Sequence, residues 1–399
     1  MDIAPGESPI GEVIQESGPD GIIYNAFIPH PLPSSPIIGI GAYEAATQAA
    51  MAVARLDQAL SQLPEPSLLV RPIIRREAVS TSALEGTYAA LDEVLEADFL
   101  EARQMSNELR EVYNFVHATS LAMELTRKYP ISLRVICELQ KEIVKGTPGD
   151  KFDAGMLRQQ QVYIGARGTR IDDARFVPPP PGPVLQNGVS EWEKCINEQN
   201  SVPVVIKMAL GHYQFETLHP FSDGNGRVGR LVAILQLTTD NTLRLPALNL
   251  SPWLESHKDQ YIDSLLRVSK TGDFDSWIVF FSQAVQVQAY DGIATIAELL
   301  AYKDATIVEL RSSGARGIIL QIVENLIGYP VIDIPTVRKL TGKTFEASNQ
   351  AVTRLVDHGI LREITGRRIN RLFICDPVLR IINRTAPIKV TNSGILSSQ

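Results

Sequence analysis

Hydrophobic residues recur every three to four positions over most of the chain, a spacing that predicts a mainly α-helical protein. The segment 41–62 is rich in alanine and ends before Pro64 and Pro66, which interrupt a helix. The same periodicity predicts further helices at 71–88, 88–98, 102–128, 131–146, 186–199, 202–217, 251–270 and 274–311.

A different pattern begins in the C-terminal quarter of the chain. The apolar spacing predicts a helix at 316–327, a second from Pro335 to Gly342 and a third at about 345–358. Residues 361–374 then alternate between apolar and polar around a glycine, as a β-hairpin does. Three helices and a basic hairpin predict a winged helix-turn-helix, a small α+β domain.

These patterns divide the chain into five parts. Residues 1–40 are rich in proline and glycine and are expected to form an irregular N-terminal arm. A helical N-terminal region is expected at 41–130, a helical central domain at 131–311, the winged helix at 314–385 and a flexible polar tail at 386–399.

The composition is that of a soluble globular protein, with 44% hydrophobic and 21% charged residues in a chain of 399. The net charge of −7 argues against a general nucleic-acid binder. Residues 314–375, however, contain nine Lys or Arg against five Asp or Glu, a local excess of four positive charges. Duplex DNA is therefore a candidate partner of the C-terminal domain, and a scaffold or homodimer role is the alternative.

The sequence shows no feature of export or membrane insertion. Its first residues lack the basic start and apolar core of a secretory signal, and the richest apolar run, at 277–281, is too short to span a bilayer. Three scattered cysteines, Cys137, Cys195 and Cys375, fit neither a zinc site nor a disulfide framework. We therefore expect a cytoplasmic protein with no membrane partner.

The most informative segment is 219–230, which reads His-Pro-Phe-Ser-Asp-Gly-Asn-Gly-Arg-Val-Gly-Arg. Pro220 ends the helix before it, and two glycines in the following turn allow close backbone approach. An apolar run from Leu231 predicts that a helix restarts at about Asn225 or Gly226. The turn therefore presents backbone amides at a helix N-terminus, which attract anions.

Four side chains of this segment suit a nucleoside triphosphate. Arg227 and Arg230 are three residues apart, so both face one side of the new helix and can bind phosphate. Asp223 supplies the hard oxygen ligand that Mg²⁺ takes beside phosphate oxygens. His219 belongs to the residue type best suited to a general base near neutral pH. Together they indicate a nucleotide reaction driven by positioning and charge stabilisation.

At these residues the chain resembles the Fic family, whose signature is His-Pro-Phe-x-(Asp or Glu)-Gly-Asn-Gly-Arg-x-x-Arg. Every signature position is matched within 219–230. The resemblance implies a helical core with a short β-hairpin flap, and transfer of AMP from ATP to a Ser, Thr or Tyr hydroxyl of a protein. By the family's assignments, His219 would deprotonate the target hydroxyl and Asp223 would hold Mg²⁺ between the α- and β-phosphates.

The resemblance also implies how the nucleotide is bound. The turn formed by Gly224, Asn225 and Gly226 would cradle the phosphates. Arg227 would stabilise the pyrophosphate leaving group, and Arg230 would reach the γ-phosphate. These implied roles agree with the chemistry of the residues themselves.

A second motif lies upstream. Residues 81–86, Thr-Ser-Ala-Leu-Glu-Gly, match the family's inhibitory pattern, (Ser or Thr)-x-x-x-Glu-(Gly or Asn), and follow a helical stretch. The resemblance implies that Glu85 pairs with Arg230 and holds ATP in a non-productive pose. The chain would then belong to the class with an N-terminal inhibitory helix (class II). A solvated Glu85 on a helix surface is the plainer alternative.

A β-hairpin is also predicted between the two motifs. Val162, Tyr163 and Ile164 suit a short strand, and Gly165 with Gly168 suits a turn. Fic proteins carry a flap at this point that docks the target peptide by adding a strand to it. A plain surface hairpin is the alternative.

The sequence therefore predicts a protein adenylyltransferase that uses ATP and Mg²⁺, is inhibited through Glu85, and modifies a protein substrate or itself. The alternative is a nucleotide-sensing, DNA-binding transcriptional regulator, although a pure sensor has no need of the base His219. Kinase-type relatives depart from the Gly-Asn-Gly-Arg core found here, and AMP removal with Glu85 positioning a water is a further alternative. Tyr261 and Leu265, on a later helix, are expected to be core residues.

Overall fold

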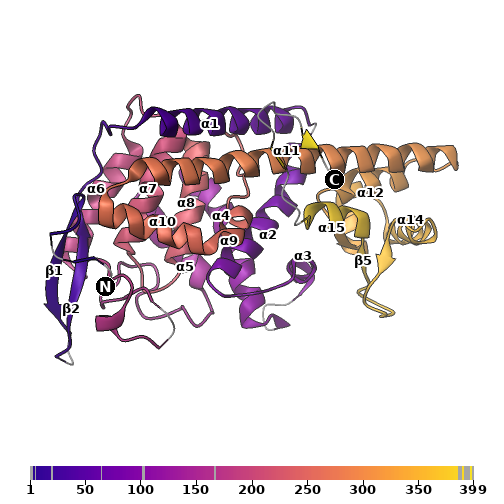
Figure 1. Cartoon of the computed structure of the whole chain (residues 1–399). Coiled ribbons are helices and arrows are strands. Elements are labelled where there is room, and N and C mark those ends of the chain that lie inside the picture. Colours follow the sequence, from indigo (N-terminus) through magenta and orange to yellow (C-terminus); the bar gives the residue numbers. More distant parts are fainter. Residues whose placement is uncertain are drawn as a thin grey trace.

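The computed structural model describes residues 3–4, 6–18, 21–63, 65–100, 104–165, 168–384, 389–390 and 396–397. Helices dominate this part of the chain, as the apolar periodicity predicts, and small antiparallel sheets accompany them. Figure 1 shows a helical body with a β-hairpin at one end and the C-terminal elements at the other.

The helical body follows the predicted periodicity closely. The helix expected at 251–270 is divided, because His257 has φ −122° and ψ 31°, which lie outside helical geometry. The body contains α1 (Ile40–Ser61), α2 (Pro66–Leu84), α3 (Leu91–Glu96), α4 (Asn107–Thr126), α5 (Leu133–Val144), α6 (Pro183–Asn197), α7 (Val204–Leu218), α8 (Asn225–Thr239), α9 (Ser251–Ser256), α10 (Lys258–Thr271) and α11 (Phe274–Ser312), with short 3₁₀ turns at Ala97–Phe99 and Ile171–Asp173.

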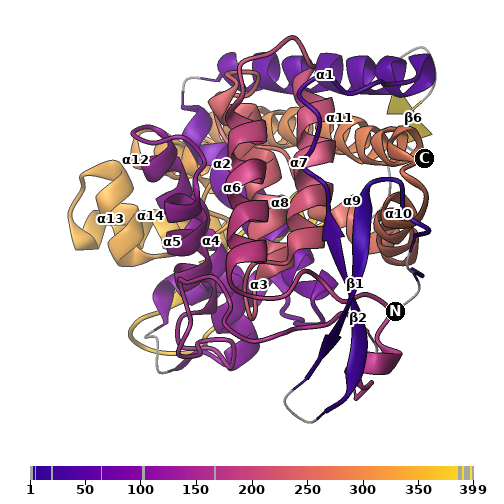
Figure 2. The ribbon, with the colours of Figure 1, turned by 90° about the vertical axis from the view of Figure 1, so that its left-hand side faces the viewer.

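The helices α1 and α11 pack along each other, and small residues permit their close approach. The buried face of α1 contains Ala42, Ala46 and Ala49, followed by Leu56. Gly292 of α11 lies against Leu56, where a β-carbon would come within 3.0 Å of the leucine side chain. Figure 2 shows the two helices together along one side of the bundle, next to α6, α7 and α8.

The helices α7 and α8 form the centre of the bundle. Nearly all of their residues are buried, which is the behaviour of a helix that is surrounded by others. The first part of the segment 219–230 connects the two helices, and the rest forms the start of α8, which begins at Asn225 as predicted. The central packing therefore fixes the signature segment on both sides.

The elements from residue 314 to residue 384 are called the C-terminal module below. Asp333 and Thr344 cap two of its helices through their side chains, accepting from the amides of Thr336 and Ala347. Its three strands are antiparallel neighbours in the order β3-β5-β4, and β3 and α15 were not predicted. The module contains α12 (Ile318–Leu326), β3 (Val331–Asp333), α13 (Ile334–Thr341), α14 (Phe345–Asp357), β4 (Arg362–Glu363), β5 (Leu372–Ile374) and α15 (Asp376–Ile382).

The irregular N-terminal arm expected over 1–40 is wrong at 11–17 and 23–29, where the chain forms two strands. Strand β1 (Gly11–Ser17) pairs antiparallel with β2 (Ile23–Pro29), and Phe27 of β2 is fully buried. The high proline and glycine content hid the hairpin, although Pro-Asp-Gly at 19–21 is itself a turn sequence.

Of the described residues in the predicted flap hairpin, 162–165 and 168, only Ile164 is paired, in one antiparallel bridge. The backbones of Ile164 and Phe176 exchange two hydrogen bonds, of 2.8 and 3.0 Å, while Val162 and Tyr163 have no strand pairing. The chain that returns from the flap is held by the N-terminal hairpin instead, because the Phe27 amide donates to the Val177 carbonyl at 2.9 Å. The path of the flap therefore depends on this tertiary contact, and not only on the turn predicted from Gly165 and Gly168.

Further expectations concern the tail, the membrane and the cysteines. The flexible tail at 386–399 lies largely outside the described residues, and within it β6 (Lys389–Val390) pairs with β7 (Leu396–Ser397). No helix in the described ranges has both the length and the apolar character needed to cross a bilayer. All three cysteines are free thiols.

Candidate active site

The signature segment begins with a strained residue. His219 ends α7 in the left-handed region, with φ 47° and ψ 60°, which is uncommon for a residue with a side chain. Buried Arg158 holds this conformation, because its Nε donates to the His219 carbonyl at 2.8 Å and its amide donates to Pro220 at 2.9 Å. The histidine is thus fixed in place by contacts to its own backbone.

The turn after His219 is closed by Asn225. The Asn225 side chain accepts from the Phe221 amide and donates to the Phe221 carbonyl, both at 2.8 Å. Gly224 has φ +83°, a conformation that glycine adopts at low cost. Gln140 of α5 donates to the Asp223 carbonyl at 3.0 Å and ties the turn to the bundle. Asn225 therefore holds the turn together, and its side chain points into the loop.

The environment of His219 suits a base. Burial, and then the positive charge of Arg158, lower the pKa of His219 to about 4. Its Nδ1 lies 3.3 Å from the Glu216 carbonyl, a contact in which Nδ1 acts as the donor. The imidazole is then neutral at physiological pH, with Nε2 left as the acceptor of a proton.

The predicted contact between the two motifs is present. An oxygen of Glu85 lies 2.5 Å from a terminal nitrogen of Arg230, whose side chain is buried. Thr81 is the first residue of the upstream motif. Its hydroxyl accepts from Arg230 Nε at 2.7 Å, and its carbonyl accepts from a terminal nitrogen of Arg230 at 3.0 Å. A β-carbon at Gly226 would overlap the Glu85 carboxylate, so this glycine leaves the space for an anion beside Arg230.

The Glu85–Arg230 pair is charged on both sides. Burial alone would raise the pKa of Glu85, but the Arg230 guanidinium outweighs burial and holds that pKa below its usual value. Burial likewise opposes the charge of Arg230, and the Glu85 carboxylate raises the pKa of Arg230 above its usual value. The ion pair therefore persists throughout the neutral pH range.

Arg227 forms a second ion pair in the turn. It lies 3.0 Å from Glu111 of α4 and 3.1 Å from Asp223, whose side chain is 40% exposed. The described residues contain no group of three His, Cys, Asp or Glu side chains that could hold a metal ion without further ligands. An exposed single carboxylate fits Mg²⁺ that arrives with a nucleotide, because Mg²⁺ is often bound by one carboxylate plus phosphate oxygens.

A cavity of about 360 Å³ opens beside His219 and Arg230, a volume typical of small-molecule sites. Tyr261 and Leu265, expected in the core, both line it, and Tyr261 also belongs to the core. A larger cavity of about 610 Å³ lies at the other end of α7 and α8, but no signature residue lines it. The remaining lining of the smaller cavity includes Leu84, Glu85, Tyr163, Ile164, Gly165, Arg175, Phe176, Glu216, Thr217, Gly226, Lys258, Ile262, Leu266 and Ser269.

Three of the four predicted flap residues reach the cavity. Tyr163, Ile164 and Gly165 line it, whereas Val162 does not. These three flap residues therefore border the cavity that His219 lines, although they do not form the predicted hairpin.

Sequence reasoning missed several residues of the site. Arg158 supports the backbone of His219, and Lys258 donates to the Leu84 carbonyl at 2.6 Å. Burial raises the pKa of Glu216 to about 7, and one of its oxygens is buried with no hydrogen-bond partner among the described atoms. Glu216 precedes His219 by three residues, but nothing in that spacing distinguishes a site residue from a helix residue.

Two family models match adjacent parts of the chain. The model described as Fic/DOC family N-terminal matches residues 43–124, and the model described as Fic/DOC family matches residues 130–237. The chain contains a Fic/DOC domain. The first match includes α2 with its Glu85, and the second contains the complete signature segment.

Curated relatives and solved structures agree with this assignment. The chain is 29% identical over 183 residues to the protein adenylyltransferase Fic of Drosophila grimshawi, and 30% identical over 160 residues to that of Aedes aegypti. These matches cover 44% and 39% of this chain, which spans only 34% and 28% of the two relatives. The chain therefore spans about a third of the length of the curated relatives it matches.

Two structures show the same fold. A Fic family protein from Desulfovibrio desulfuricans G20 has a TM-score of 0.56 at 16% identity, over 86% of this chain and 98% of that one. Fic-1 (residues 134–508) from C. elegans has a TM-score of 0.50 at 19% identity, over 64% and 74% of the two chains. The fold is thus mainly helical with small sheets, as the sequence predicted.

Proposed function

We propose that the protein is an adenylyltransferase that transfers AMP from ATP to a hydroxyl of a protein, and that Glu85 inhibits it. The observation that carries the proposal is the 2.5 Å ion pair between Glu85 and buried Arg230, beside a cavity that His219 also lines. The similarity to the protein adenylyltransferases Fic of Drosophila grimshawi and Aedes aegypti supports the reaction type.

The chemistry follows from the residues present. His219 Nε2 takes the proton of the target hydroxyl, whose oxygen forms a bond to the α-phosphorus of ATP. The bond from that phosphorus to the bridging oxygen breaks, and pyrophosphate leaves. The α8 N-terminus and the Arg227 side chain stabilise the negative charge that builds up on the phosphates. Asp223 would hold Mg²⁺, which supplies further neutralisation of the phosphates when it is bound.

Inhibition follows from competition for one guanidinium. Arg230 can pair with Glu85 or with the terminal phosphate of ATP, but Glu85 fills the space above Gly226 that an anion would need. The Arg230 side chain is 2% exposed and that of Glu85 is 39% exposed, so a nucleotide that binds Arg230 must first displace the glutamate from its buried partner. The wild-type protein should therefore bind ATP without using it well.

The test is incubation with ATP labelled at the α- or the γ-phosphate. We expect Glu85→Gly to retain the α-label on protein at least tenfold faster than wild type, and the Glu85→Gly/His219→Ala protein to retain it at least about a hundredfold more slowly than Glu85→Gly. Retention of the γ-label would identify a kinase and overturn AMP transfer, and equal rates for wild type and Glu85→Gly would overturn inhibition. Loss of label from pre-modified protein only when Glu85 is intact would favour AMP removal instead.

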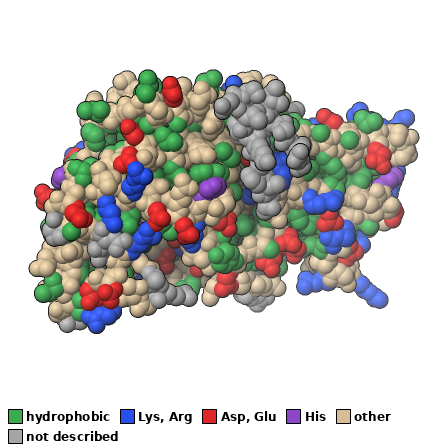
Figure 3. All heavy atoms as spheres, in the orientation of Figure 1, with side chains coloured by type: hydrophobic (Ala, Val, Ile, Leu, Met, Phe, Trp, Pro, Cys, Tyr) green, Lys and Arg blue, Asp and Glu red, His purple; other side chains and the backbone are tan. Residues whose placement is uncertain are grey.

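We also propose a second function, in which the C-terminal module acts as a winged helix-turn-helix and binds duplex DNA. The outward face of α14 carries exposed Gln350, Thr353 and Arg354, side chains that bind base edges and phosphates. The β4–β5 connection carries exposed Arg367 and Arg368. Figure 3 shows Lys and Arg side chains at this outer end of the molecule.

The connection is held in a fixed position beside α14. Arg371 donates to the Asn349 side chain of α14 at 2.7 Å and lies 3.6 Å from Glu363 of β4. Such a fixed geometry lowers the ordering cost of binding. Ile369, 77% exposed between the arginines and Asn370, is suited to contact the floor of a minor groove.

Fluorescence anisotropy with a mixed-sequence 24-base-pair duplex, over a range of salt, tests this second function. We expect binding that weakens steeply with salt, and a slope smaller by about two in Arg367→Ala/Arg368→Ala. Lys128→Ala/Lys194→Ala removes the same charge from the helical body and should leave the slope unchanged. Salt-insensitive binding, or equal loss in both variants, would overturn the DNA assignment and favour a protein-contact role.

A further inference from the structure

The inhibitory helix α2 is in contact with two different parts of the protein. Its C-terminal end carries Thr81 and Glu85, which hold Arg230. Its first half, from Leu68 to Arg76, lies against the C-terminal module instead. The two halves therefore connect the nucleotide site with the C-terminal module, which lies far from it in the sequence.

The first contact depends on a proline and a glycine. Pro72 lies inside α2 and has no amide hydrogen, so the Leu68 carbonyl lacks its usual helical donor. Gly328, which follows α12, is buried against this carbonyl, and a β-carbon at position 328 would overlap the Leu68 oxygen. The module therefore approaches α2 closely at Gly328, beside the turn where Pro72 removes a helical hydrogen bond.

The second contact is a buried charge network. Arg76 of α2 lies 2.6 Å from Asp291 of α11 and donates to the Arg384 carbonyl at 2.9 Å. Arg384, just after α15, lies 3.1 Å from the other oxygen of Asp291 and also pairs with Glu298. Asp291 is 5% exposed, so its two arginine partners compensate a charge that would be costly to leave unpaired.

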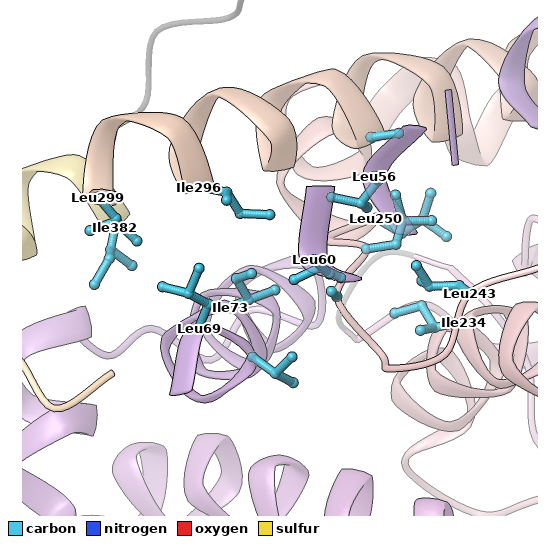
Figure 4. Packing of buried hydrophobic residues seen from close by; sticks show 14 of the residues in the cluster. Leu56, Leu60, Leu69, Ile73, Ile234, Leu243, Leu250, Ile296, Leu299 and Ile382 are labelled. Carbon is cyan, nitrogen blue, oxygen red and sulfur yellow. The ribbon is translucent and has the colours of Figure 1, made fainter. Parts of the chain in front are cut away.

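Apolar packing joins the same surfaces. Leu69 and Ile73 of α2 belong to one core cluster with Leu299 of α11 and Ile382 of α15, and Figure 4 shows these four side chains. The Arg71 guanidinium lies 4.3 Å from the centre of the Tyr329 ring, the residue after Gly328. The interface between α2 and the C-terminal module thus combines a charge network, an arginine–tyrosine contact and aliphatic packing.

The second half of α2 is held by contacts to α9 and α10. Buried Glu77 accepts from the Ser251 amide at 2.9 Å and from the Ser251 hydroxyl, and Lys258 donates to the Leu84 carbonyl at 2.6 Å. The opened turn lies before Pro72, and the stretch from Arg76 to the end of α2 contains no further proline. Movement at Arg76 is therefore passed on to Glu85 through regular helix.

We infer that the C-terminal module holds α2 in its inhibitory position, and that loosening the Gly328 and Arg384 contacts relieves inhibition. This regulatory role rests on the proposed adenylyltransferase function. A charge-assisted hydrogen bond weakens steeply with displacement and misalignment. A tilt of α2 that moves the Glu85 carboxylate by about 1 Å therefore exposes Arg230 to the nucleotide without any change in the signature segment.

Two variants loosen the contact from the module's side. Gly328→Ala places a methyl group against the Leu68 carbonyl, and Arg384→Ala removes the outer partner of Asp291. We expect each to raise incorporation of the α-label about three- to tenfold over wild type, with a single unfolding transition retained. The matched controls are Gly41→Ala, where a β-carbon meets no atom within 4 Å, and Arg362→Ala, which breaks an exposed ion pair inside the module.

A Glu85→Gly background separates this inference from the proposed function. If Arg384→Ala acts through α2, it should add less than twofold to the activity of Glu85→Gly. Activation by Glu85→Gly with no activation by either module variant would overturn the inference and leave the proposed function standing. No activation by Glu85→Gly itself would overturn the proposed function. Equal activation by the control variants would show general loosening and would also overturn the inference.

Discussion

The signature turn and the flap lie on the same cavity, yet they are held in very different ways. The turn is buried and closed by hydrogen bonds from Asn225 and Arg158. In the described part of the flap, the backbone is joined to the protein by the bridge from Ile164 to Phe176, and the Gln161 side chain donates to the Pro178 carbonyl at 3.0 Å. Tyr163 beside the bridge is 44% exposed. Groups that must meet a nucleotide in one geometry are rigidly placed, whereas groups that would meet a protein partner are left accessible.

The difference has a physical reason. Phosphate binding and proton transfer depend on sub-ångström placement, which burial and multiple hydrogen bonds provide. A flap that adds a strand to a peptide needs free backbone groups, and those groups cannot also be tied down. We therefore expect substitutions in the turn to affect chemistry and stability strongly, and substitutions in the flap to affect neither strongly.

The largest effect is expected at His219. In the Glu85→Gly background, His219→Ala should lower AMP transfer roughly 10²- to 10⁴-fold, because the hydroxyl then loses its base. ATP affinity, measured by calorimetry, should change less than threefold. Transfer within a factor of ten of the parent would contradict the assignment of the base.

The next effect is on stability. Asn225→Ala leaves the buried Phe221 amide and carbonyl without partners, which should lower the free energy of unfolding by about 2–5 kcal/mol. Urea unfolding followed by circular dichroism measures it. Asn107→Ala, at an exposed position in the first turn of α4, is the control and should stay within about 0.5 kcal/mol. Equal values for the two variants would mean that the turn is not rigid.

A smaller effect is expected in the flap. Tyr163→Ala in the Glu85→Gly background should slow modification of a protein acceptor about two- to fivefold, because only part of a docking surface is removed. Melting temperature and ATP affinity should match those of the parent. A loss as large as that of His219→Ala would place Tyr163 in the chemistry and remove the contrast between the two regions.

The smallest effect concerns pH. His219 has a folded-state pKa of about 4, below the ordinary value near 6.5, so the stabilisation from its neutral form is present above 6.5 and is lost as pH falls through 4. Activity of Glu85→Gly at pH 5.5 should therefore fall less than twofold from its value at pH 7.5. Removal of the Glu85 charge lowers this pKa further. A tenfold fall, as an exposed histidine base would give, would contradict the buried environment.

The sequence predicted most helices because their apolar periodicity is long and regular, and it predicted the signature turn because the residues themselves dictate its shape. Arg158 and Glu216 were missed, since their importance comes only from what they face in the folded chain. The N-terminal hairpin was missed because proline and glycine content outweighed the alternation in its strands. The pairing of the flap was placed wrongly, because Ile164 pairs with Phe176, beyond the predicted turn at 165–168. The returning chain is bound by β2, a contact between distant segments that no local pattern encodes.

The helix α11, 39 residues and about 58 Å long, has a practical consequence for anyone preparing the protein. It covers the alanine-rich face of α1 at one end and packs on α12 and α15 at the other. A shortened gene that stops at the end of the Fic/DOC match would leave the α1 face uncovered, and one that stops after α11 would expose the second surface. Soluble material should therefore require residues through at least Arg384.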